Sequence, residues 1–307
     1  MRPQKFSEFV GQSDVVTQIQ LAMRSAEKRG TSIDHVLLTG PPGLGKTTIA
    51  QIIAKETNRR CVETNANVIR NPADALAQIV NLRNGDVLFI DEIHALPIAV
   101  QEYLYPAMED YKVTTISQLS SRSAVTINLN RFVLVGATTI EGQLTGPMID
   151  RFGIICRLIQ YSRDDLRLII RNAAKQMKLT IDEKSVDLIS ARCRSTPRIA
   201  LRHLKRAYDS AICHDKRNCI DAESVLHAYK ILRIGEHGLT DHDLKMLTIL
   251  AQSEHLIGLE SMAAQLNTTV MTISTVIEPH LMRIGAIERT PRGRKITSFG
   301  RRLINGT

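Results

Sequence analysis

The sequence predicts three consecutive domains: an α/β domain with a parallel sheet, an all-helical domain, and a small domain of three helices and a β-hairpin. In the first half, short apolar runs alternate with amphipathic helical stretches, and from residue 163 to about residue 234 the pattern is helical throughout. A single hydrophobic core also rarely supports as many as 307 residues. We therefore place the domains at 1–158, 159–235 and 236–307.

Five short apolar runs predict the strands of the parallel sheet. They are Val36–Thr39, Cys61–Thr64, Val87–Ile90, Phe132–Ala137 and Ile154–Leu158. A helix from about Lys46 to Glu56 follows the first run, and further helical patterns separate several of the others. Such alternation is typical of a parallel sheet covered by helices.

The C-terminal pattern predicts a winged helix. Gly235 and Gly238 mark a break after the helical domain. Three helices and then two hairpin strands follow, over Asp241–Gln252, Leu259–Leu266, Thr272–Arg283, Ala286–Glu288 and Lys295–Thr297. Three helices followed by a basic hairpin is the layout of that fold.

Composition restricts the class of protein. Hydrophobic residues make up 43% and charged residues 23%, which is ordinary for a globular protein. We expect no membrane span and no secretory signal, because no long apolar run occurs. The five cysteines form no CxxC pair, which favours reduced thiols over a zinc site or a disulfide framework. We therefore expect a cytoplasmic protein.

The turn after the first strand matches the phosphate-binding pattern GxxxxGK[ST]. It consists of Gly40, Pro41, Pro42, Gly43, Leu44, Gly45, Lys46 and Thr47. Glycines let backbone N–H groups approach phosphate oxygens, and the next helix presents its positive N-terminal end to the anion. Lys46 can reach the outer phosphates, and the Thr47 hydroxyl can ligate Mg²⁺. The pattern predicts a nucleotide site.

Two further strand ends supply groups for hydrolysis. Asp91 and Glu92 follow the strand Val87–Ile90, where Asp91 could hold Mg²⁺ and Glu92 could deprotonate the attacking water. Alone, a solvated acidic pair would be the better interpretation; beside a phosphate-binding loop it is not. Thr139, at the end of another strand, could hydrogen-bond the water or the γ-phosphate, although threonine is common in strands.

Two arginines could stabilise the transition state of phosphoryl transfer. Arg151 lies near the end of the sheet domain, and Arg198 begins a helix of the all-helical domain. An arginine donated by a neighbouring subunit would make the active unit an oligomer. The alternative is that each is an ordinary surface residue.

Charge is concentrated beyond the first half of the chain. The net charge is +9, and residues 281–307 carry seven basic side chains and one acidic side chain. This suggests a polyanion partner, although charge alone fits a solvated surface equally well. Six Phe, six Tyr and no Trp offer little base stacking, so we expect contact with the duplex backbone.

With these residues in place, the sequence resembles the RuvB family, AAA+ motors that drive branch migration of Holliday junctions in bacteria. The resemblance covers almost the whole chain. Its most specific segments are LYPAMED at Leu104–Asp110 and RTPRGR at Arg289–Arg294. Its other segments are Arg2–Gln12, Asp34–Thr48, Gly85–Leu96, Gly136–Thr139, Asp150–Ile154 and Thr196–Ala200.

The resemblance implies a role for each matching residue, with ATP and Mg²⁺ as cofactors. Thr139 would be the first sensor, Arg151 the arginine finger acting in trans, and Arg198 the second sensor. Further nucleotide contacts would come from Thr48, Arg2 and Tyr161, and DNA backbone contacts from Arg289, Arg292 and Arg294.

The resemblance also implies partners. The family works as a hexameric ring around duplex DNA, docked to a RuvA tetramer that holds the four-way junction. The segment Lys112–Leu129 would be the hairpin that grips RuvA; without the family, a hairpin packed on its own domain is the better interpretation.

Three departures from the family pattern stand out. Ile149 stands two positions before Arg151, where the family usually has an arginine. The change removes a charge from the subunit interface, so ring assembly or its coupling to ATP could differ from the family's. The hairpin tip reads Ser117–Ser121 where glycines are usual. Few residues precede Arg2, so contacts to adenine are expected to be reduced or rebuilt.

Two other functions compete with a translocating motor. A clamp-loader-like or helicase-loader switch would carry the same nucleotide-binding residues, but the basic hairpin favours the motor. A DNA-binding scaffold with a structural nucleotide site would not need the base Glu92.

Overall fold

The computed structural model describes residues 2–116, 124–214, 218–253 and 255–305. The chain forms two compact units, Met1–Asp165 and Leu166–Thr307. The predicted boundary at residue 235 falls inside the second unit. Throughout the described residues, no helix has the length and apolar character needed to cross a membrane.

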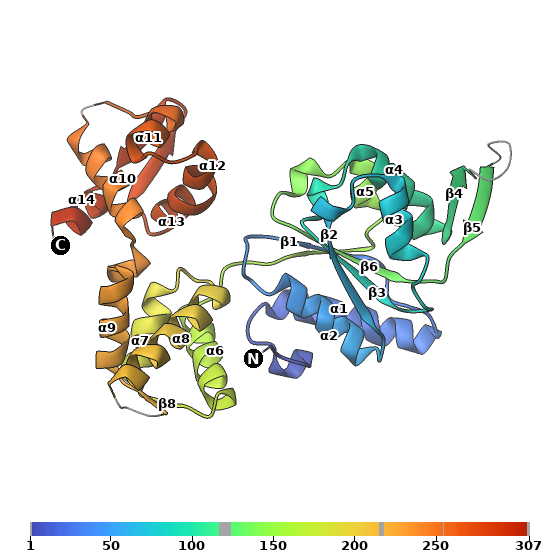
Figure 1. The fold of residues 1–307 in the computed structure, drawn as a ribbon, viewed down its shortest axis with the longest axis horizontal. Helices are drawn as coiled ribbons and strands as arrows, with labels where there is room; N and C mark the ends of the chain where they lie inside the picture. Colours follow the sequence, from blue (N-terminus) through green and yellow to red (C-terminus); the bar gives the residue numbers. More distant parts are fainter. Residues whose placement is uncertain (1, 117–123, 215–217, 254, 306–307) are drawn as a thin grey trace. The chain divides into compact units, whose positions relative to one another are not determined.

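A five-stranded parallel sheet organises the first unit, in the order β2-β3-β6-β1-β7 (Figure 1). The strands are β1 (Val36–Thr39), β2 (Cys61–Asn65), β3 (Val87–Asp91), β6 (Val133–Thr138) and β7 (Ile154–Arg157). All five predicted strands are present. The residues of β1 and β6 are buried throughout, as expected for strands covered on both faces.

Helices cover both faces of this sheet (Figure 1). On one face lie α1 (Ser13–Arg29) and α2 (Lys46–Glu56), and on the other lie α3 (Pro72–Ile79), α4 (Ile98–Glu109) and α5 (Gly146–Asp150). Short 3-10 helices fill the connections: η1 (Phe6–Glu8), η2 (Ala66–Val68), η3 (Ile93–Ala95) and η4 (Glu141–Gln143). The carboxyl ends of β1, β3 and β6 therefore share one sheet edge, where ligands of such folds bind.

A separate antiparallel hairpin follows α4. Its strands are β4 (Lys112–Ile116) and β5 (Ala124–Asn128), with Lys112 opposite Asn128. The two strands thus match the predicted hairpin Lys112–Leu129. Its tip, Ser117–Ser121, lies outside the described residues.

Helices make up most of the second unit's first half. They are α6 (Arg163–Gln176), which spans the boundary between the units, α7 (Glu183–Arg192), α8 (Pro197–Cys213) and α9 (Ala222–Leu232). The short strands β8 (Thr180–Ile181) and β9 (Cys219–Ile220) pair in parallel. The carboxylates of Asp182 and Asp221 accept backbone N–H groups at the starts of α7 and α9, which fixes where those helices begin.

The rest of the second unit is a winged helix. Its elements are η5 (Glu236–Gly238), α10 (Asp241–Gln252), α11 (Leu259–Leu266), α12 (Val270–Thr272), η6 (Ile273–Ile277), α13 (Glu278–Arg283), β10 (Ile287–Thr290), β11 (Gly293–Ile296) and α14 (Ser298–Asn305). Helices α10 and α11 have the predicted bounds. The third predicted helix instead contains a π-helical turn, η6, which ends two residues before Pro279. A proline has no N–H to donate to the preceding turn.

Candidate nucleotide site and DNA-binding surface

Two glycines give the loop between β1 and α2 its shape. Gly40 has φ +131°, and an added Cβ would lie 2.5 Å from the carbonyl oxygen of Leu158. Gly45 has φ +108°, and its added Cβ would lie 3.1 Å from the ring of Phe9. A side chain is therefore excluded at Gly40 and strained by the backbone angle at Gly45, and glycine keeps the backbone of the loop open to an anion.

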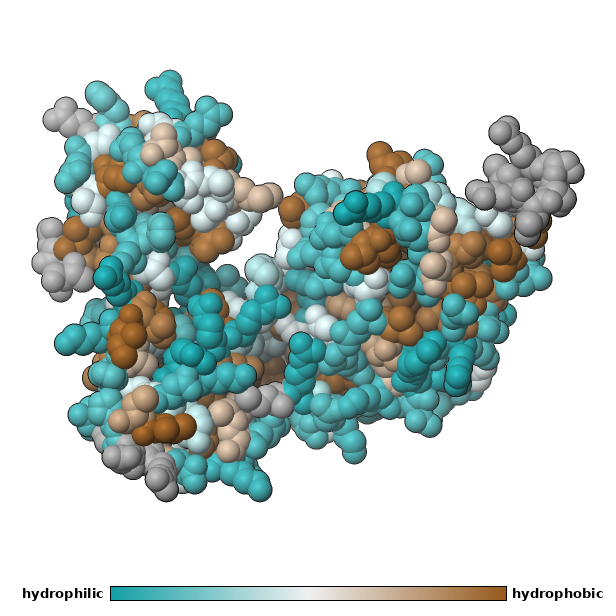
Figure 2. Space-filling model, viewed as in Figure 1, coloured by the Kyte–Doolittle hydropathy of each residue, from teal (hydrophilic) through white to brown (hydrophobic). Residues whose placement is uncertain are grey.

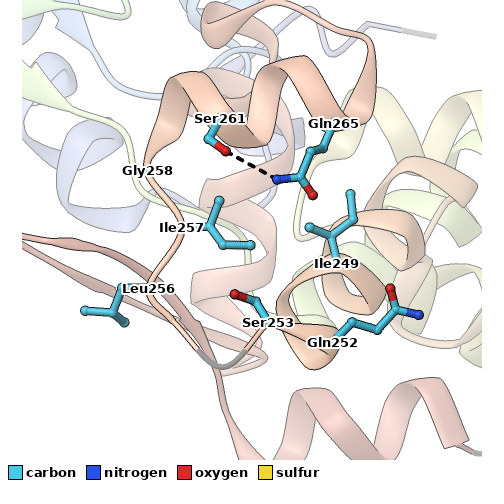
Figure 3. Close-up of a pocket in the computed structure, with 8 residues that line it drawn as sticks. All are labelled: Ile249, Gln252, Ser253, Leu256, Ile257, Gly258, Ser261 and Gln265. Carbon is cyan, nitrogen blue, oxygen red and sulfur yellow. Dashed lines mark hydrogen bonds between the residues drawn. The ribbon is translucent and has the colours of Figure 1, made fainter.

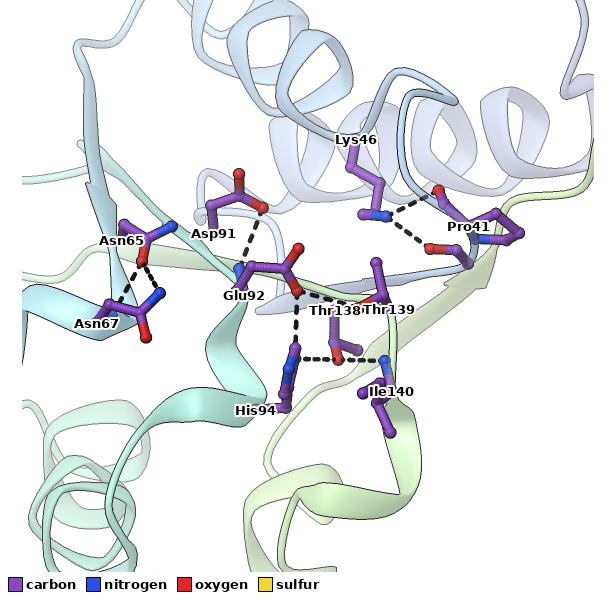
Figure 4. Close-up of polar contacts among 11 residues, drawn as sticks. Pro41, Lys46, Asn65, Asn67, Asp91, Glu92, His94, Thr138, Thr139 and Ile140 are labelled. Atoms are coloured by element: carbon purple, nitrogen blue, oxygen red, sulfur yellow. Dashed lines mark hydrogen bonds and ion pairs between the residues drawn. The ribbon is translucent and has the colours of Figure 1, made fainter. Parts of the chain in front are cut away.

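The loop holds the ammonium group of Lys46. Lys46 is 8% exposed, and its Nζ donates to the carbonyl oxygens of Gly40 at 2.6 Å and Pro41 at 3.1 Å (Figure 4). It is the first residue of α2, so the positive end of the helix lies beside the charged side chain. Thr47 and Thr48 follow in the same turn, both half-buried. The loop therefore concentrates positive charge, and its contact with phosphate stays a prediction.

The acidic pair lies at the carboxyl end of β3. Asp91 is the last residue of the strand, and its Oδ1 accepts the backbone N–H of Glu92 at 3.1 Å. Glu92 has left-handed backbone angles, φ 50° and ψ 44°. Such a conformation costs about 1–3 kcal/mol in a residue other than glycine and is often retained at functional sites. Its side chain is 34% exposed and so remains accessible to water.

A polar network connects Glu92 to the end of β6 (Figure 4). The Thr139 hydroxyl donates to Glu92 Oε2 at 3.2 Å, and His94 Nδ1 lies 3.3 Å from the same oxygen. His94 Nδ1 also lies 2.9 Å from Thr138 Oγ1. Thr139 was predicted to belong to the site, but sequence reasoning assigned no role to His94 or Thr138. Their proximity to Glu92 and Thr139 in the sequence was the only signal.

The residues present fit Mg²⁺. Thr47 and Asp91 offer a hydroxyl and a carboxylate oxygen, the ligand types that this ion prefers. Among the described residues, no cluster of three or more His, Cys, Asp or Glu could hold a metal on its own. Two protein oxygens completed by substrate phosphates suit Mg²⁺ better than an all-protein cage would.

Tyr161 braces the phosphate-binding loop. Its hydroxyl donates to the carbonyl oxygen of Leu44 at 3.0 Å, and the side chain is 6% exposed. Burial raises the pKa of this phenol, which keeps it protonated as a donor. Arg2, the other predicted contact outside the loop, is exposed, and its carbonyl accepts from the Gln4 amide at 2.8 Å.

Arg151 is held against its own domain. Its guanidinium carbon lies 4.2 Å from the centre of the Tyr105 ring, while Nη1 donates to Pro147 O at 2.7 Å. Nη2 forms an ion pair with the half-exposed Glu109 at 3.2 Å. One guanidinium nitrogen, Nε, is buried without a hydrogen-bond partner.

The wing is the hairpin formed by β10, β11 and the turn between them, residues 287–296. Its three arginines have different environments. Arg292 is exposed in the turn between β10 and β11. The side chain of Arg289 is 64% exposed and lies 4.0 Å from Glu278. Arg294 is 7% exposed and uses Nε and Nη2 to bind both carboxylate oxygens of Glu278, at 3.1 and 3.0 Å. Arg289 and Arg292 are thus exposed, whereas Arg294 is buried against a structural partner, which is against its predicted contact with DNA.

Comparison with known proteins identifies the family. Three family models, all described as parts of RuvB, match the chain: the Holliday junction DNA helicase P-loop domain over residues 1–158, the AAA lid domain over 161–235, and the C-terminal winged-helix domain over 236–305. The chain belongs to the RuvB family.

Individual relatives support this assignment. The Holliday junction branch migration complex subunit RuvB of Synechococcus sp. strain CC9311 is 41% identical, over 98% of this chain and 85% of its own length. RuvB of Helicobacter pylori strain J99 is 42% identical, with 97% and 89% covered. The solved structure of the Thermotoga maritima RuvB Holliday junction branch migration motor has a TM-score of 0.87 and 40% identity, over 99% and 98% of the two chains.

The structure shows the surroundings of Ile149 and Arg198, two positions that the RuvB resemblance singled out. Ile149, where an arginine was expected from the family, is partly buried and packs against the apolar core of the first unit. Arg198 is exposed in the first turn of α8, in the second unit. The contact of Arg198 with nucleotide stays a prediction.

The hairpin predicted to bind RuvA presents apolar surface. Val125 on β5 is 43% exposed. Figure 2 shows hydrophobic surface over the β4–β5 region. Ile127 and Leu129 pack partly against the core of the same unit. The hairpin therefore packs partly on its own domain and also exposes an apolar side chain, and its contact with RuvA stays a prediction.

A shallow hollow of about 450 Å³ lies beside α10 and α11 of the winged helix (Figure 3). Its polar lining comes from Ser and Gln side chains, and Gln265 donates to Ser261 there at 3.3 Å. None of the described residues that line it is charged, so they supply no side-chain cation for a phosphate. The DNA surface is better sought on the wing.

Proposed function

We propose that this chain is an ATP-driven motor that moves duplex DNA at four-way junctions, working as one subunit of a hexameric ring. The observation that carries the proposal is Glu92. A base at the end of β3, held by Thr139 beside the phosphate-binding loop, fits a chain that hydrolyses ATP. A scaffold that only binds nucleotide would need no such base.

Each group of the site contributes a separate effect to hydrolysis. Lys46 binds the outer phosphates of ATP, while Glu92 orients the attacking water and accepts its proton. Thr47 and Asp91 would hold Mg²⁺, which supplies charge neutralisation at the phosphates when bound. Thr139 keeps the carboxylate of Glu92 aligned from the neighbouring strand, and Arg2 and Tyr161 contribute to the walls around the nucleotide.

The ring completes the site. Arg151 of one subunit would stabilise the transition state in the next, and Arg198 would read the γ-phosphate from the lid. The stacking of Arg151 on Tyr105 and its ion pair with Glu109 give it a defined starting position. Because Glu109 is half-exposed, Arg151 can leave this ion pair and contact a nucleotide bound to the neighbouring subunit.

DNA and a junction-binding protein would occupy two other surfaces. Arg289 and Arg292 would contact phosphates of the duplex, which gives the sequence-independent, salt-dependent binding that a translocating motor needs. The apolar outward side of the Lys112–Leu129 hairpin would bind a RuvA-type protein that holds the junction.

A junction-migration assay tests the proposal. Labelled four-way junctions are incubated with the chain, ATP and Mg²⁺, with and without a RuvA-type protein, at several salt concentrations. The motor predicts ATP-dependent movement that needs both proteins. DNA-stimulated hydrolysis without movement would instead indicate a loader-type switch, and nucleotide binding without turnover would indicate a scaffold.

A further inference from the structure

The loop that carries Arg198 begins with two residues in an unfavourable conformation. Arg194 and Ser195 have φ 53° and 55°, consecutive left-handed values without a glycine. Such a conformation costs about 1–3 kcal/mol per residue unless surrounding contacts maintain it. Thr196 and Pro197 then lead directly into α8, with Arg198 in its first turn. The position of Arg198 therefore depends on what holds Arg194.

The side chain of Arg194 is held by the start of the winged helix. Its Nη2 lies 2.5 Å from Asp243 Oδ2, and Nε and Nη2 both donate to the carbonyl oxygen of Gly238, at 3.0 and 2.9 Å. Asp243 is completely buried. The same Oδ2 accepts the backbone N–H and the hydroxyl of Thr240, at 2.7 and 2.5 Å, and so caps α10. One buried carboxylate thus joins α10 to the loop that begins at Arg194 and precedes α8.

The backbone of Arg194 is held by another helix. Its carbonyl oxygen accepts from Arg283 Nη1 at 2.9 Å, and Arg283 Nη2 lies 2.6 Å from His280 Nδ1, both on α13. Gly238 packs against the backbone just before this loop. It has φ +73°, and an added Cβ would collide with the carbonyl oxygen of Arg192. The loop is therefore fixed by α10, by α13 and by the Gly238 turn.

We propose that Arg194 is a positioning residue that ties the lid arginine Arg198 to the winged helix. DNA held on the wing then changes the rate of ATP hydrolysis, because movement of α10 and α13 passes through Arg194 to the start of α8. This inference rests on the proposed function, in which Arg198 reads the γ-phosphate and the wing binds DNA.

A second ion pair at the start of α10 provides a matched control. Arg233 and Asp241 lie 3.0 Å apart, but their side chains are 77% and 47% exposed, against 14% and 0% for Arg194 and Asp243. Exposed pairs contribute little to stability. The two acidic partners are two residues apart on one helix, and they differ in burial, in the capping of α10 by Asp243 and in their link to the Arg198 loop.

The experiment compares two double variants of the full-length chain, Arg194→Met with Asp243→Asn and Arg233→Met with Asp241→Asn. In the first, Asn leaves no unpaired buried charge, and its Oδ1 can still cap α10. Steady-state kcat and KM for ATP are measured with and without saturating duplex DNA, together with DNA affinity and the thermal midpoint.

The buried-pair variant is expected to lose about fivefold or more of its DNA stimulation of kcat, in the range usual for coupling between two sites. Its DNA affinity is expected to stay close to wild type, and the Arg233 control is expected to be stimulated normally. Unchanged stimulation with a lowered thermal midpoint would show that the pair is merely structural and overturn the inference.

A single variant, Arg194→Lys, keeps the result decisive if the double variant does not fold. Lysine retains the charge beside Asp243 but lacks the fork that also reaches Gly238, so stimulation should still fall. Normal stimulation in Arg194→Lys would then contradict the inference. A wild-type chain that DNA does not stimulate at all would instead refute the proposed function itself.

Discussion

Two glutamates, one in each unit, show how burial separates chemistry from structure. Glu92 is 34% exposed, and its contacts with Thr139 and His94 fall on one carboxylate oxygen, at 3.2 and 3.3 Å. Glu278 is 3% exposed, and Arg294 binds both of its oxygens. The first carboxylate keeps one oxygen for a water and a proton, whereas the second is completely engaged. The free oxygen of Glu92 therefore suits a role in chemistry, whereas the burial and double pairing of Glu278 suit a structural role.

The largest expected effect is on ATP hydrolysis, from a substitution of Glu92. Glu92→Gln should lower kcat for ATP hydrolysis by about 10²–10⁴-fold, because the amide cannot accept the proton from water. ATP affinity and the free energy of unfolding should change little, since Gln keeps the size of the side chain. Equilibrium binding of a fluorescent ATP analogue, beside single-turnover hydrolysis, separates the two effects. Near-normal turnover in this variant would remove Glu92 from the mechanism.

Breaking the buried ion pair between Arg294 and Glu278 should instead lower the stability of the fold. Arg294→Met should lower the free energy of unfolding by about 3–5 kcal/mol, because Glu278 is left charged and buried without its partner. The double variant Arg294→Met with Glu278→Gln should recover most of that loss. Thermal and urea denaturation measure both. A stable Arg294→Met chain with impaired DNA binding would instead make Arg294 a DNA contact.

The smallest expected effect belongs to the exposed wing. Arg292→Ala should leave stability within about 0.5 kcal/mol of wild type, as is usual for surface substitutions. It should weaken duplex binding evenly across sequences and reduce the salt slope of the affinity by about one. Fluorescence anisotropy with two unrelated duplexes at several salt concentrations measures this. Loss confined to one sequence would argue for base readout.

Most of the architecture follows from apolar periodicity and one turn motif. The strands β1 and β3 were predictable because they are short, continuously apolar runs, as expected for buried parallel strands. The helices α2, α10 and α11 were predictable because their apolar residues recur at helical spacing. The π-helical turn before Pro279 was not, since a proline inside an apolar helical pattern shows only that the ladder is disturbed. The phosphate-binding loop was predictable because few residue types permit its backbone.

The arginines show where sequence reasoning reached its limit. Arg294 was grouped with Arg289 and Arg292 because all three belong to one basic segment. Its inward direction had a signal, because Arg294 lies two residues before the buried Ile296 and strand residues at that spacing share a face. Arg194 had none: its partner Asp243 is 49 residues away in the chain, and only the folded second unit brings them together.

Subunit mixing tests most directly the central claim that one chain supplies the phosphate-binding loop and its neighbour supplies a guanidinium. Chains carrying Arg151→Ala are titrated with chains carrying Lys46→Ala, each inactive alone, and ATP hydrolysis is measured at constant total protein. Mixed rings should regain turnover, because some interfaces combine an intact Lys46 with an intact Arg151. No recovery at any ratio, with a wild type that hydrolyses ATP equally well as a dilute monomer, would contradict the account.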